Sequence, residues 1–245
     1  IYVTLVVVQS VLLKVAGMSW FDSVCHSFAT VATGGFSTKN ASLIEQTPLV
    51  QYIVIFFMIV SGINFTLHYL LFHGKFKKVW ENEELKTYLA IILVSSLIIA
   101  VYIAPWGQLT WEKAFRDSLF QVASIITATG FASADYQVWP QAAKMVILLV
   151  MLVGACAGST GGGIKVARYV VIYKNFTQSM RRLVRPNSVQ VARFNGQPIS
   201  PEASAGILGF VFIYIMTIVI GSFIIMGTGL DYVSAFSSVI TTLGG

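Results

Sequence analysis

The sequence predicts an all-α protein that crosses a membrane several times and is built from a repeated helical unit. The first observation is composition, because 56% of the 245 residues are hydrophobic and only 11% are charged, against about 25% charged residues in soluble domains. The second is a set of apolar runs that approach the roughly 20 residues a membrane helix needs. The third is a Thr/Gly phrase that occurs twice, as "TVATGGFST" at 30–38 and "ITATGFASA" at 126–134.

Five apolar runs are predicted to form membrane helices. They cover 1–17, 48–73, 87–105, 140–157 and 203–227. The chain opens without Met inside the first run and stops at Gly244-Gly245, so we expect a fragment of a longer protein, and no signal peptide is recognised in it. Cys25 and Cys156 lie in apolar surroundings without metal-ligand spacing, and both are predicted to be small buried side chains.

Basic residues indicate which ends of these runs face the cytoplasm. The stretch 165–196 contains seven Lys and Arg residues and no acid, and 75–86 contains four lysines. Because positively charged loops stay inside, both stretches are predicted to be cytoplasmic. The runs then alternate in direction and leave 18–47, 106–139 and 228–245 outside. A nucleic-acid-binding patch is rejected, since aromatic residues do not alternate with the arginines.

Each external segment contains an apolar stretch that is too short to cross a membrane. The first two are "WFDSVCHSFATVA" at 20–32 and "FRDSLFQVASIITA" at 115–128. A helix of about twelve residues is roughly 18 Å long, well short of the bilayer core. Such a segment is predicted to enter the membrane and return, and any non-helical backbone at that depth must be buried in protein or line water.

The external segments align with one another without a gap. Asp22 falls on Asp117 and Gly35 on Gly130, with thirteen residues from Asp to Gly in both. The third segment, "SAFSSVITTLGG", fits the same frame with Ser234 at the Asp position, and its matching glycine would fall at position 247. Both aspartates are predicted to lie at the start of their short helices, where an acid offsets exposed N–H groups. We do not expect them to bind ions.

The Thr/Gly turns follow the C-terminal ends of the short helices, where free carbonyl groups carry partial negative charge. Glycine lets the chain turn its carbonyl oxygens inward without a side-chain clash. A ring of such oxygens can replace the water shell of a K⁺ ion. We therefore predict a cation filter. The alternative, that the turns only allow close helix packing, is disfavoured by two copies in register.

These features together resemble the Trk/Ktr/HKT superfamily of cation transporters, most closely its bacterial Trk-type potassium-uptake membrane subunits. The likeness is carried by "TVATGGFST", "TATGFASADY" and "GACAGSTGGGIK" and covers nearly the whole chain. It implies an all-α polytopic membrane protein in which four M1–P-loop–M2 units surround a pseudo-fourfold pore and the filter binds the transported K⁺. The implied filter residues are Thr33, Gly34, Gly35, Ala128, Thr129, Gly130 and Gly245.

On this resemblance the chain is a fragment of the four repeats that lacks the first repeat and the final inward helix. The expected divisions are 1–74 for the second repeat, 75–86 for a cytoplasmic loop, 87–175 for the third repeat with a broken second helix, 176–202 for a cytoplasmic basic segment, and 203–245 for the start of the fourth repeat, truncated in its filter. In the family one glycine per filter favours K⁺, and a serine in the first filter accompanies Na⁺ permeation in some plant members. Gly35 and Gly130 match the K⁺ pattern.

The stretch "GACAGSTGGGIK" at 154–165 interrupts an apolar run with five glycines. Each glycine costs a helix about 1 kcal/mol relative to Ala, so a break is predicted. It is not a phosphate-binding loop of the Walker type, because Ile164 separates the last glycine from Lys165 and Val166 follows in place of Ser or Thr. Close helix packing through small residues stays open.

The resemblance implies that this stretch is an intramembrane loop that obstructs the pore below the filter. Ser159 and Thr160 are predicted to bond freed backbone groups. Lys165 is either an anchor at the membrane interface or a gate residue. The implied gate residues are Gly158, Ser159, Thr160, Gly161, Gly162, Gly163 and Lys165.

Polar side chains within the helices are given structural roles. His26 aligns with Gln121 of the next repeat and is predicted to pack through hydrogen bonds. Asn64 and His68 lie four residues apart on one face of an inward helix, toward the cavity or a neighbouring helix. Nothing in the sequence resembles a nucleophile–base pair, a carboxylate pair or a metal cluster, so we do not expect an enzyme.

Three functions stay open at this point. The first is K⁺ uptake through a carbonyl-lined filter with an intramembrane gating loop. The second is Na⁺ or mixed Na⁺/K⁺ transport within the same superfamily. The third is a polytopic membrane enzyme or assembly factor whose Gly turns are scaffolding.

The resemblance also implies a location and partners. It places the chain in the bacterial inner membrane, with the filter loops external and the basic loops cytoplasmic. Expected partners are membrane lipid, a second copy in a homodimer, and a cytosolic nucleotide-binding regulatory subunit, but no nucleic acid. The basic stretch 165–196 is either a docking or lipid surface or only a signal for topology.

Overall fold

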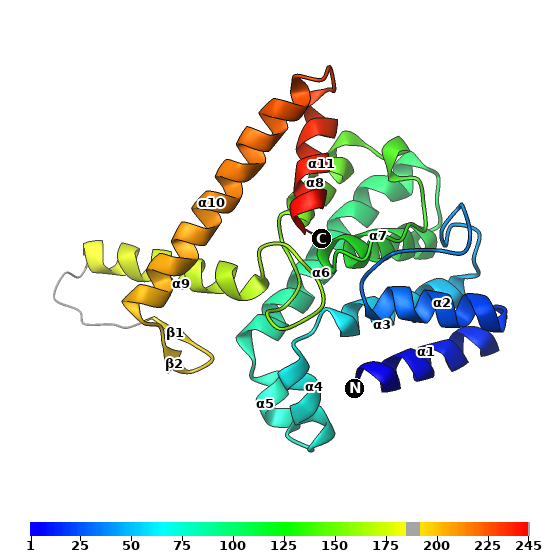
Figure 1. Ribbon diagram of the computed structural model, residues 1–245, viewed down its shortest axis with the longest axis horizontal. Helices are drawn as coiled ribbons and strands as arrows, with labels where there is room; N and C mark the ends of the chain where they lie inside the picture. Colours follow the sequence, from blue (N-terminus) through cyan, green and yellow to red (C-terminus); the bar gives the residue numbers. More distant parts are fainter. Residues whose placement is uncertain (185–191, 245) are drawn as a thin grey trace.

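The computed structural model describes residues 1–184 and 192–244, and within these ranges the chain is mostly helical (Figure 1). The predicted filter residue Gly245 and residues 185–191 of the predicted basic segment lie outside these ranges. The helices are α1 (Tyr2–Val15), α2 (Trp20–Val31), α3 (Pro48–Ser61), α4 (Phe65–Phe72), α5 (Phe76–Trp80), α6 (Glu83–Trp106), α7 (Trp111–Ile126), the 3₁₀ helix η1 (Tyr136–Val138), α8 (Gln141–Met151), α9 (Val166–Val184), α10 (Pro201–Met226) and α11 (Tyr232–Gly244).

The first repeated unit consists of α1, α2 and α3, drawn in blue in Figure 1. α2 begins where the Ser19 side chain accepts a hydrogen bond from the Asp22 N–H. It ends at the C-cap Ala32, so the short helix predicted at 20–32 is confirmed. The unit shares an apolar core with the next one, which holds both short helices in one block. That core includes Leu13, Leu43, Val54 and Met58 from the first unit and Phe120 and Phe131 from the second.

The second repeated unit consists of α6, α7 and α8. α6 has 24 residues and is therefore about 36 Å long. α7 begins at Trp111, earlier than the predicted 115, because the Thr110 side chain caps it by accepting the Lys113 N–H. Asp117 consequently lies inside the helix and is buried, so its predicted place at the helix start is wrong. The acid in the first turn is Glu112.

The predicted inward run 48–73 is not one helix. α3 and α4 meet at an angle of 100° at a short break between Ser61 and Phe65. A Cβ on Gly62 would overlap the Tyr88 hydroxyl and lie 2.9 Å from Cγ2 of Thr127, so only glycine fits there. The run is therefore two helices joined at a sharp bend, as in a broken span or a re-entrant loop.

The break also changes the roles expected for two polar residues of this run. Asn64 caps α4 by accepting the Thr66 N–H at 2.8 Å. His68 Nε2 lies 3.0 Å from the Val60 carbonyl oxygen. Both side chains therefore satisfy backbone groups beside the break, and the expectation that they share one face of a continuous helix is wrong.

α8 is also shorter than its predicted run and ends at Met151. A loop at 152–165 follows it and contains all five glycines of the predicted break. α9 then starts at Val166 and continues across position 175, where the sequence predicts the end of the third repeat. We call residues 154–165 the glycine loop.

α10 and α11 stand as a helical pair beside the two units (Figure 1). Tyr214 and Ile218 of α10 and Val239 and Ile240 of α11 form a small core with Ile164, next to the glycine loop. By length and composition, two described helices are suited to cross a membrane, α6 and α10, and the bent pair α3–α4 adds a third if it is one span.

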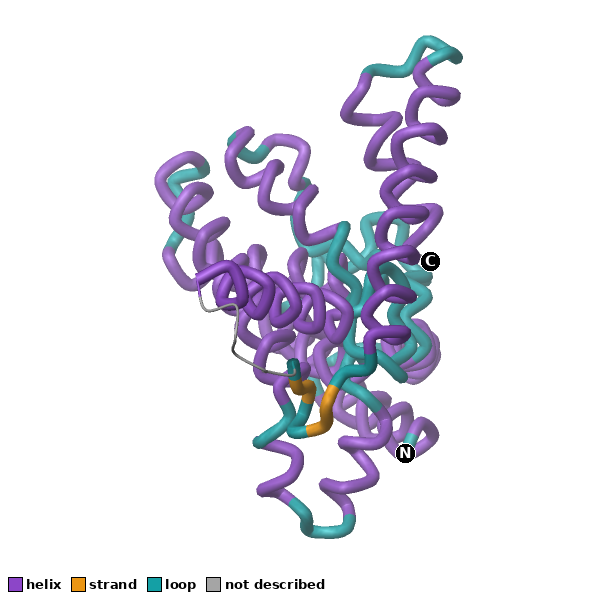
Figure 2. Tube along the Cα trace, turned by 90° about the vertical axis from the view of Figure 1, so that its left-hand side faces the viewer, coloured by secondary structure: helices purple, strands orange, loops and turns teal. Residues whose placement is uncertain are grey.

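A short hairpin with two residues in each strand departs from the predicted all-α structure. Strands β1 (Arg193–Phe194) and β2 (Gln197–Pro198) pair antiparallel just before α10, and Figure 2 shows them in orange. Lys174 of α9 donates to the Arg193 carbonyl at 2.6 Å and to the Glu83 carboxylate at 2.5 Å. The hairpin therefore ties α9 to the first turn of α6.

Candidate functional site

The Thr/Gly turns after α2 and α7 have the same backbone hydrogen bonds, shifted by the 95 residues that separate the two phrases. In each turn, two successive N–H groups donate to one carbonyl of the last helical turn, at 2.8 Å and 3.4 Å. The shorter of these bonds, together with the bond donated by the preceding N–H, from Thr33 to Thr30 in one turn and from Ala128 to Ile125 in the other, forms the Schellman pattern of helix termination. The repeat predicted from sequence is thus also a structural repeat. The donors and acceptors are Gly34 and Gly35 to Ala29, and Thr129 and Gly130 to Ser124.

Both turns place a residue other than glycine in the left-handed region. The φ angles are 53° at Thr33 and 57° at Ala128, followed two residues later by 66° at Gly35 and 86° at Gly130. A left-handed conformation costs a residue with a Cβ roughly 1–2 kcal/mol. Strained residues of this kind cluster at functional sites, and here they occupy equivalent places.

The two turns touch each other. A Cβ on Gly35 would overlap the carbonyl oxygen of Thr129 and lie 3.1 Å from the carbonyl carbon of Gly130. Gly35 is therefore required by contact as well as by its positive φ. A Cβ on Gly130, in contrast, would meet nothing within 4 Å. The structure thus brings together six of the seven predicted filter residues, and the seventh, Gly245, is outside the described ranges.

The carbonyl groups of these turns have no hydrogen-bond donor among the described residues. No residue in 1–184 or 192–244 donates a hydrogen bond to the carbonyl oxygen of any residue in 33–35 or 128–130. They follow two helix C-termini, which carry partial negative charge. The described part of the chain also contains no cluster of three or more His, Cys, Asp or Glu side chains that could hold a metal ion. The site therefore offers neutral backbone oxygens, which suit an alkali cation.

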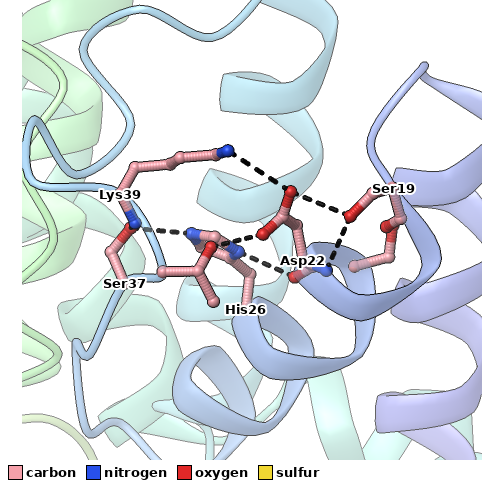
Figure 3. Close-up of polar contacts among 7 residues, drawn as sticks. Ser19, Asp22, His26, Ser37 and Lys39 are labelled. Atoms are coloured by element: carbon pink, nitrogen blue, oxygen red, sulfur yellow. Dashed lines mark hydrogen bonds and ion pairs between the residues drawn. The ribbon is translucent and has the colours of Figure 1, made fainter.

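Asp22 fixes the outer end of the first turn (Figure 3). Its carboxylate accepts hydrogen bonds from Thr38 Oγ1 at 2.5 Å and Ser19 Oγ at 2.9 Å, and it lies 3.7 Å from the Lys39 ammonium. The bonds from Thr38 and Ser19 lower the pKa of this carboxyl. Asp22 therefore joins the start of α2 to the segment beyond the turn.

His26 makes a second tie of the same kind. Its Nε2 lies 2.9 Å from Ser37 Oγ, and its Nδ1 lies 2.7 Å from the Asp22 carbonyl oxygen (Figure 3). In the other unit, Gln121 donates to the Ala134 carbonyl at 3.1 Å. The structural role predicted for His26 is confirmed. The aligned residue Gln121 likewise bonds its helix to the segment beyond the turn.

The segments beyond the turns are also bonded across the two units. The Leu43 N–H donates to the Ala132 carbonyl at 3.0 Å, and the Ala132 N–H donates to Ser42 Oγ at 3.1 Å. Behind them, Arg116 is buried and donates to Gln51 Oε1 at 2.9 Å, while the Gln51 amide donates to the Leu43 carbonyl at 2.9 Å. These bonds hold the two turns in a fixed relation.

The glycine loop lies directly beneath the second turn. A Cβ on Gly161 would lie 2.7 Å from the carbonyl oxygen of Thr127, the residue that begins the turn. The loop closes on itself where the Gly154 N–H donates to the Ile164 carbonyl at 2.8 Å. Lys165 donates to the Gly161 carbonyl, so its ammonium turns back onto the loop.

The loop is bonded to the break between α3 and α4. The Cys156 N–H donates to the Gly62 carbonyl at 3.0 Å, and the Phe65 N–H donates to the Gly158 carbonyl at 3.1 Å. Thr160 Oγ1 donates to the Ser61 carbonyl at 3.3 Å. Ser159 Oγ donates within the loop, to the Cys156 carbonyl at 2.6 Å. The hydroxyls of Ser159 and Thr160 thus satisfy freed backbone groups as predicted.

Sequence reasoning missed this partnership between two broken helices. The signal was the "SGIN" phrase at 61–64, where a glycine and an Asn N-cap interrupt an otherwise apolar run. One glycine alone is tolerated in many helices, so the phrase by itself did not predict a break.

Comparison with known proteins gives a consistent result. The family model "TrkH: Cation transport protein" matches residues 1–245. The Trk system potassium uptake protein TrkH of Escherichia coli strain K12 is 34% identical over 248 residues, which cover 99% of this chain and 51% of that protein. The Trk system potassium uptake protein TrkG of the same strain is 30% identical over 228 residues, covering 92% of this chain and 47% of that protein.

A solved structure agrees with these matches. The crystal structure of the potassium transporter TrkH from Vibrio parahaemolyticus superposes with a TM-score of 0.92 at 32% identity, covering 99% of this chain and 54% of that chain. The chain spans about half the length of the curated relatives it matches.

Proposed function

This chain belongs to the TrkH family of cation transport proteins, and on that premise we propose that it forms part of a potassium-uptake pathway through a membrane. The turns at 33–35 and 128–130 supply backbone oxygens of its filter. The glycine loop is the obstruction below that filter. The relatives are named as transport proteins rather than enzymes.

One observation carries this proposal. Two turns with the same backbone hydrogen bonds meet at Gly35 and Thr129, and no described residue donates to their carbonyl oxygens. Gly34 and Gly130 are exposed and Thr129 alone of the six residues is buried, so the turns lie open to a ligand from solution rather than sealed inside a scaffold. A cation that has lost part of its water shell is the partner that this geometry suits.

Two observations support the assignment of the glycine loop as a gate, namely its place next to the second turn and its irregular, glycine-rich backbone. Gly161 approaches the Thr127 carbonyl directly below the second turn. The loop contains positive φ angles at Gly158 and Gly163, of 70° and 71°, so it is not a segment of regular helix. Such irregular backbone at membrane depth is expected where it lines a conduction pathway.

The filter is tested by replacing its two glycines with serine. Gly130→Ser adds a hydroxyl in open space at a strained φ, so we expect normal protein levels, continued Rb⁺ flux and a reduced preference for K⁺ over Na⁺. Gly35→Ser forces apart the two turns, and we expect loss of Rb⁺ uptake in a host that lacks its own potassium uptake. Gly206→Ser, in α10 with no atom within 4 Å of its Cβ position, is the matched control and should behave as the unmodified protein.

The same flux assay separates the ions. Equal Na⁺ and K⁺ flux through the unmodified protein would replace K⁺ uptake by mixed transport. Rescue of growth at low K⁺ that survives both glycine substitutions unchanged would instead remove the turns from the pathway.

The orientation and the partners are part of the proposal. We infer that the basic stretch 165–196 faces the cytoplasm by the positive-inside rule, with the filter turns facing outward. The name Trk system carried by the relatives fits a complex of several components, and a homodimer with a cytosolic nucleotide-binding subunit is the proposed arrangement. To test the orientation, Lys78→Cys is treated with an impermeant thiol reagent. We expect the introduced thiol to be labelled from the cytoplasmic side only.

A further inference from the structure

Glu84 is a buried carboxylate that neither the filter nor the glycine loop accounts for. It lies in the first turn of α6 and is 3% exposed. A buried carboxylate is costly unless hydrogen bonds compensate for the lost water. Its Oε1 accepts the Ala157 N–H at 2.5 Å and the Ala167 N–H at 3.2 Å. One oxygen atom thus joins two residues that stand ten positions apart in the chain.

Glu84 is not needed to start its own helix. The Asn82 side chain already caps α6 by accepting the Leu85 N–H at 2.9 Å. The neighbouring Glu83 turns the other way, to Lys174 at 2.5 Å and to the Asn195 N–H at 3.2 Å. Two adjacent acids therefore serve different partners, and only Glu84 is directed to the glycine loop.

The two partners of Glu84 lie on either side of residues 158–165, which contain four of the five glycines of the loop. Ala157 precedes Gly158, and Ala167 follows Lys165 in the first turn of α9. A carboxylate beside the N-terminus of α9 is favourable because free N–H groups and the helix dipole are directed at it. Glu84 therefore joins the middle of the glycine loop to the start of α9.

The opposite side of the loop is held differently. There it is bonded to the broken span through Gly62, Ser61 and Phe65, all by neutral hydrogen bonds. Hydrogen bonds to an ionised carboxylate are roughly twice as strong as neutral ones. The contact with Glu84 is thus the stronger of the two attachments, and it is the one on the side of α9.

We propose that Glu84 is a positioning residue that holds the glycine loop across the conduction pathway, so that the loop moves aside only when the bonds to Ala157 and Ala167 break. This inference rests on the proposed gating role of the loop. It assigns to the start of α6 a part in regulation that its apolar sequence and its span across the membrane do not suggest.

The first test measures exposure of the loop through its own cysteine. Cys156 is fully buried, and in a Cys25→Ser background it is the single thiol in the chain. We expect Glu84→Ala to raise the rate at which an impermeant maleimide labels Cys156 in inside-out vesicles by about tenfold or more, since two charge-assisted bonds are lost. Glu84→Gln keeps an acceptor oxygen and should give an intermediate rate. Glu83→Ala is the matched control and should label slowly.

The second test measures transport with the same variants in the protein as it occurs in the membrane. Glu84→Ala should raise the maximal rate of Rb⁺ uptake, while the Rb⁺ concentration for half-maximal uptake stays the same, because the filter is untouched. Partial return toward the unmodified rate in Glu84→Gln would support the hydrogen-bonding role. Gel filtration in detergent checks that each variant is folded, and Glu84→Gln serves if the alanine variant is not.

The outcomes separate this inference from the proposed function. Labelling of Cys156 at the unmodified rate in both Glu84 variants overturns the positioning role. Absence of Rb⁺ uptake from the unmodified protein contradicts the transport proposal instead, and the labelling rates then still decide what Glu84 does.

Discussion

At the scale of single residues, the two turns rely on backbone conformations that most side chains avoid. Thr33 and Ala128 hold φ angles of 53° and 57°, where helices commonly end on glycine. Thr33 is β-branched, which makes this conformation a clear outlier. The hydrogen bonds that the following residues donate to the Ala29 and Ser124 carbonyls keep both residues in place.

Relief of this strain is predicted to be measurable. Ala128→Gly removes a Cβ from a left-handed position, so we expect the free energy of unfolding to rise by roughly 0.5–1 kcal/mol after the greater flexibility of unfolded glycine is counted. Thermal unfolding in detergent measures the change. Ala132→Gly, a control just beyond the turn without positive φ, should lower the midpoint. A lower unfolding midpoint in both variants would show that the backbone at Ala128 is not strained.

The residue scale also shows what alignment alone could not predict. Asp22 and Asp117 share one position in the repeat, yet the first lies in the first turn of its helix and the second lies inside a helix. The difference comes from the Thr110 cap of α7, which lies seven residues before Asp117. In α2 the cap is Ser19, three residues before Asp22.

At the scale of elements, the central feature is a pair of broken helices that complete each other. The break at 62–64 leaves carbonyl and N–H groups free, and the glycine loop supplies their partners through Cys156, Gly158 and Thr160. Broken helices at membrane depth are stable where neighbouring segments satisfy the freed backbone groups. Each break is therefore stabilised by hydrogen bonds to the other.

Gly62 is predicted to be the most sensitive position of this pair. Gly62→Ala places a methyl group against the Tyr88 hydroxyl and the Thr127 methyl, and overpacking of this kind costs about 1–3 kcal/mol. Thermal unfolding in detergent should show a lower midpoint.

The control and the rescue for this change are both in the chain. Gly209→Ala, in α10 with open space around it, should leave the midpoint unchanged or slightly higher. Tyr88→Phe removes the hydroxyl that the new methyl group meets, so the double variant should regain part of the loss. An additive double variant would show that the Tyr88 contact does not set the break.

Sequence patterns found one of the two breaks. Five glycines within 154–165 oppose any helix on propensity alone. The break at 62–64 contains a single glycine, and what excludes a helix there is the approach of Tyr88 and of the loop, both distant in the chain. Periodicity and composition carry no information on such contacts.

At the scale of the whole molecule, the two repeated units are joined by polar groups within an apolar interface. Arg116 of α7 is 7% exposed and donates to Gln51 of α3. Gln51 in turn donates to the Leu43 carbonyl, beside the bonds to Ala132. This chain of bonds runs from one unit to the other directly behind the turns.

Removal of the guanidinium is predicted to loosen the two units. Arg116→Met leaves the Gln51 oxygen without its donor, and an unpaired buried group costs roughly 1–3 kcal/mol. The unfolding midpoint in detergent should fall, and the preference of transport for Rb⁺ over Na⁺ should fall with it. Lys113→Met, an exposed position on the same helix, is the control. Equal midpoints in the two variants would show that the bond carries no stability.

The sequence predicted the equivalence of the two units but not their contact. The shared spacing from Asp to Gly made the turns comparable, and the structure confirms this down to the distances of their hydrogen bonds. That Gly35 meets Thr129 could not be predicted, because the packing of one unit on the other depends on Phe120, Phe131 and their neighbours acting together.

The meeting of Gly35 with Thr129 also bears on how the molecule is made. These residues are 94 positions apart, and long-range contacts form late because the intervening chain must first be ordered. On the proposed function, neither unit by itself can complete the pathway. A nascent chain with one unit inserted is therefore expected to be impermeable, so that biosynthesis does not discharge the ion gradients of the cell.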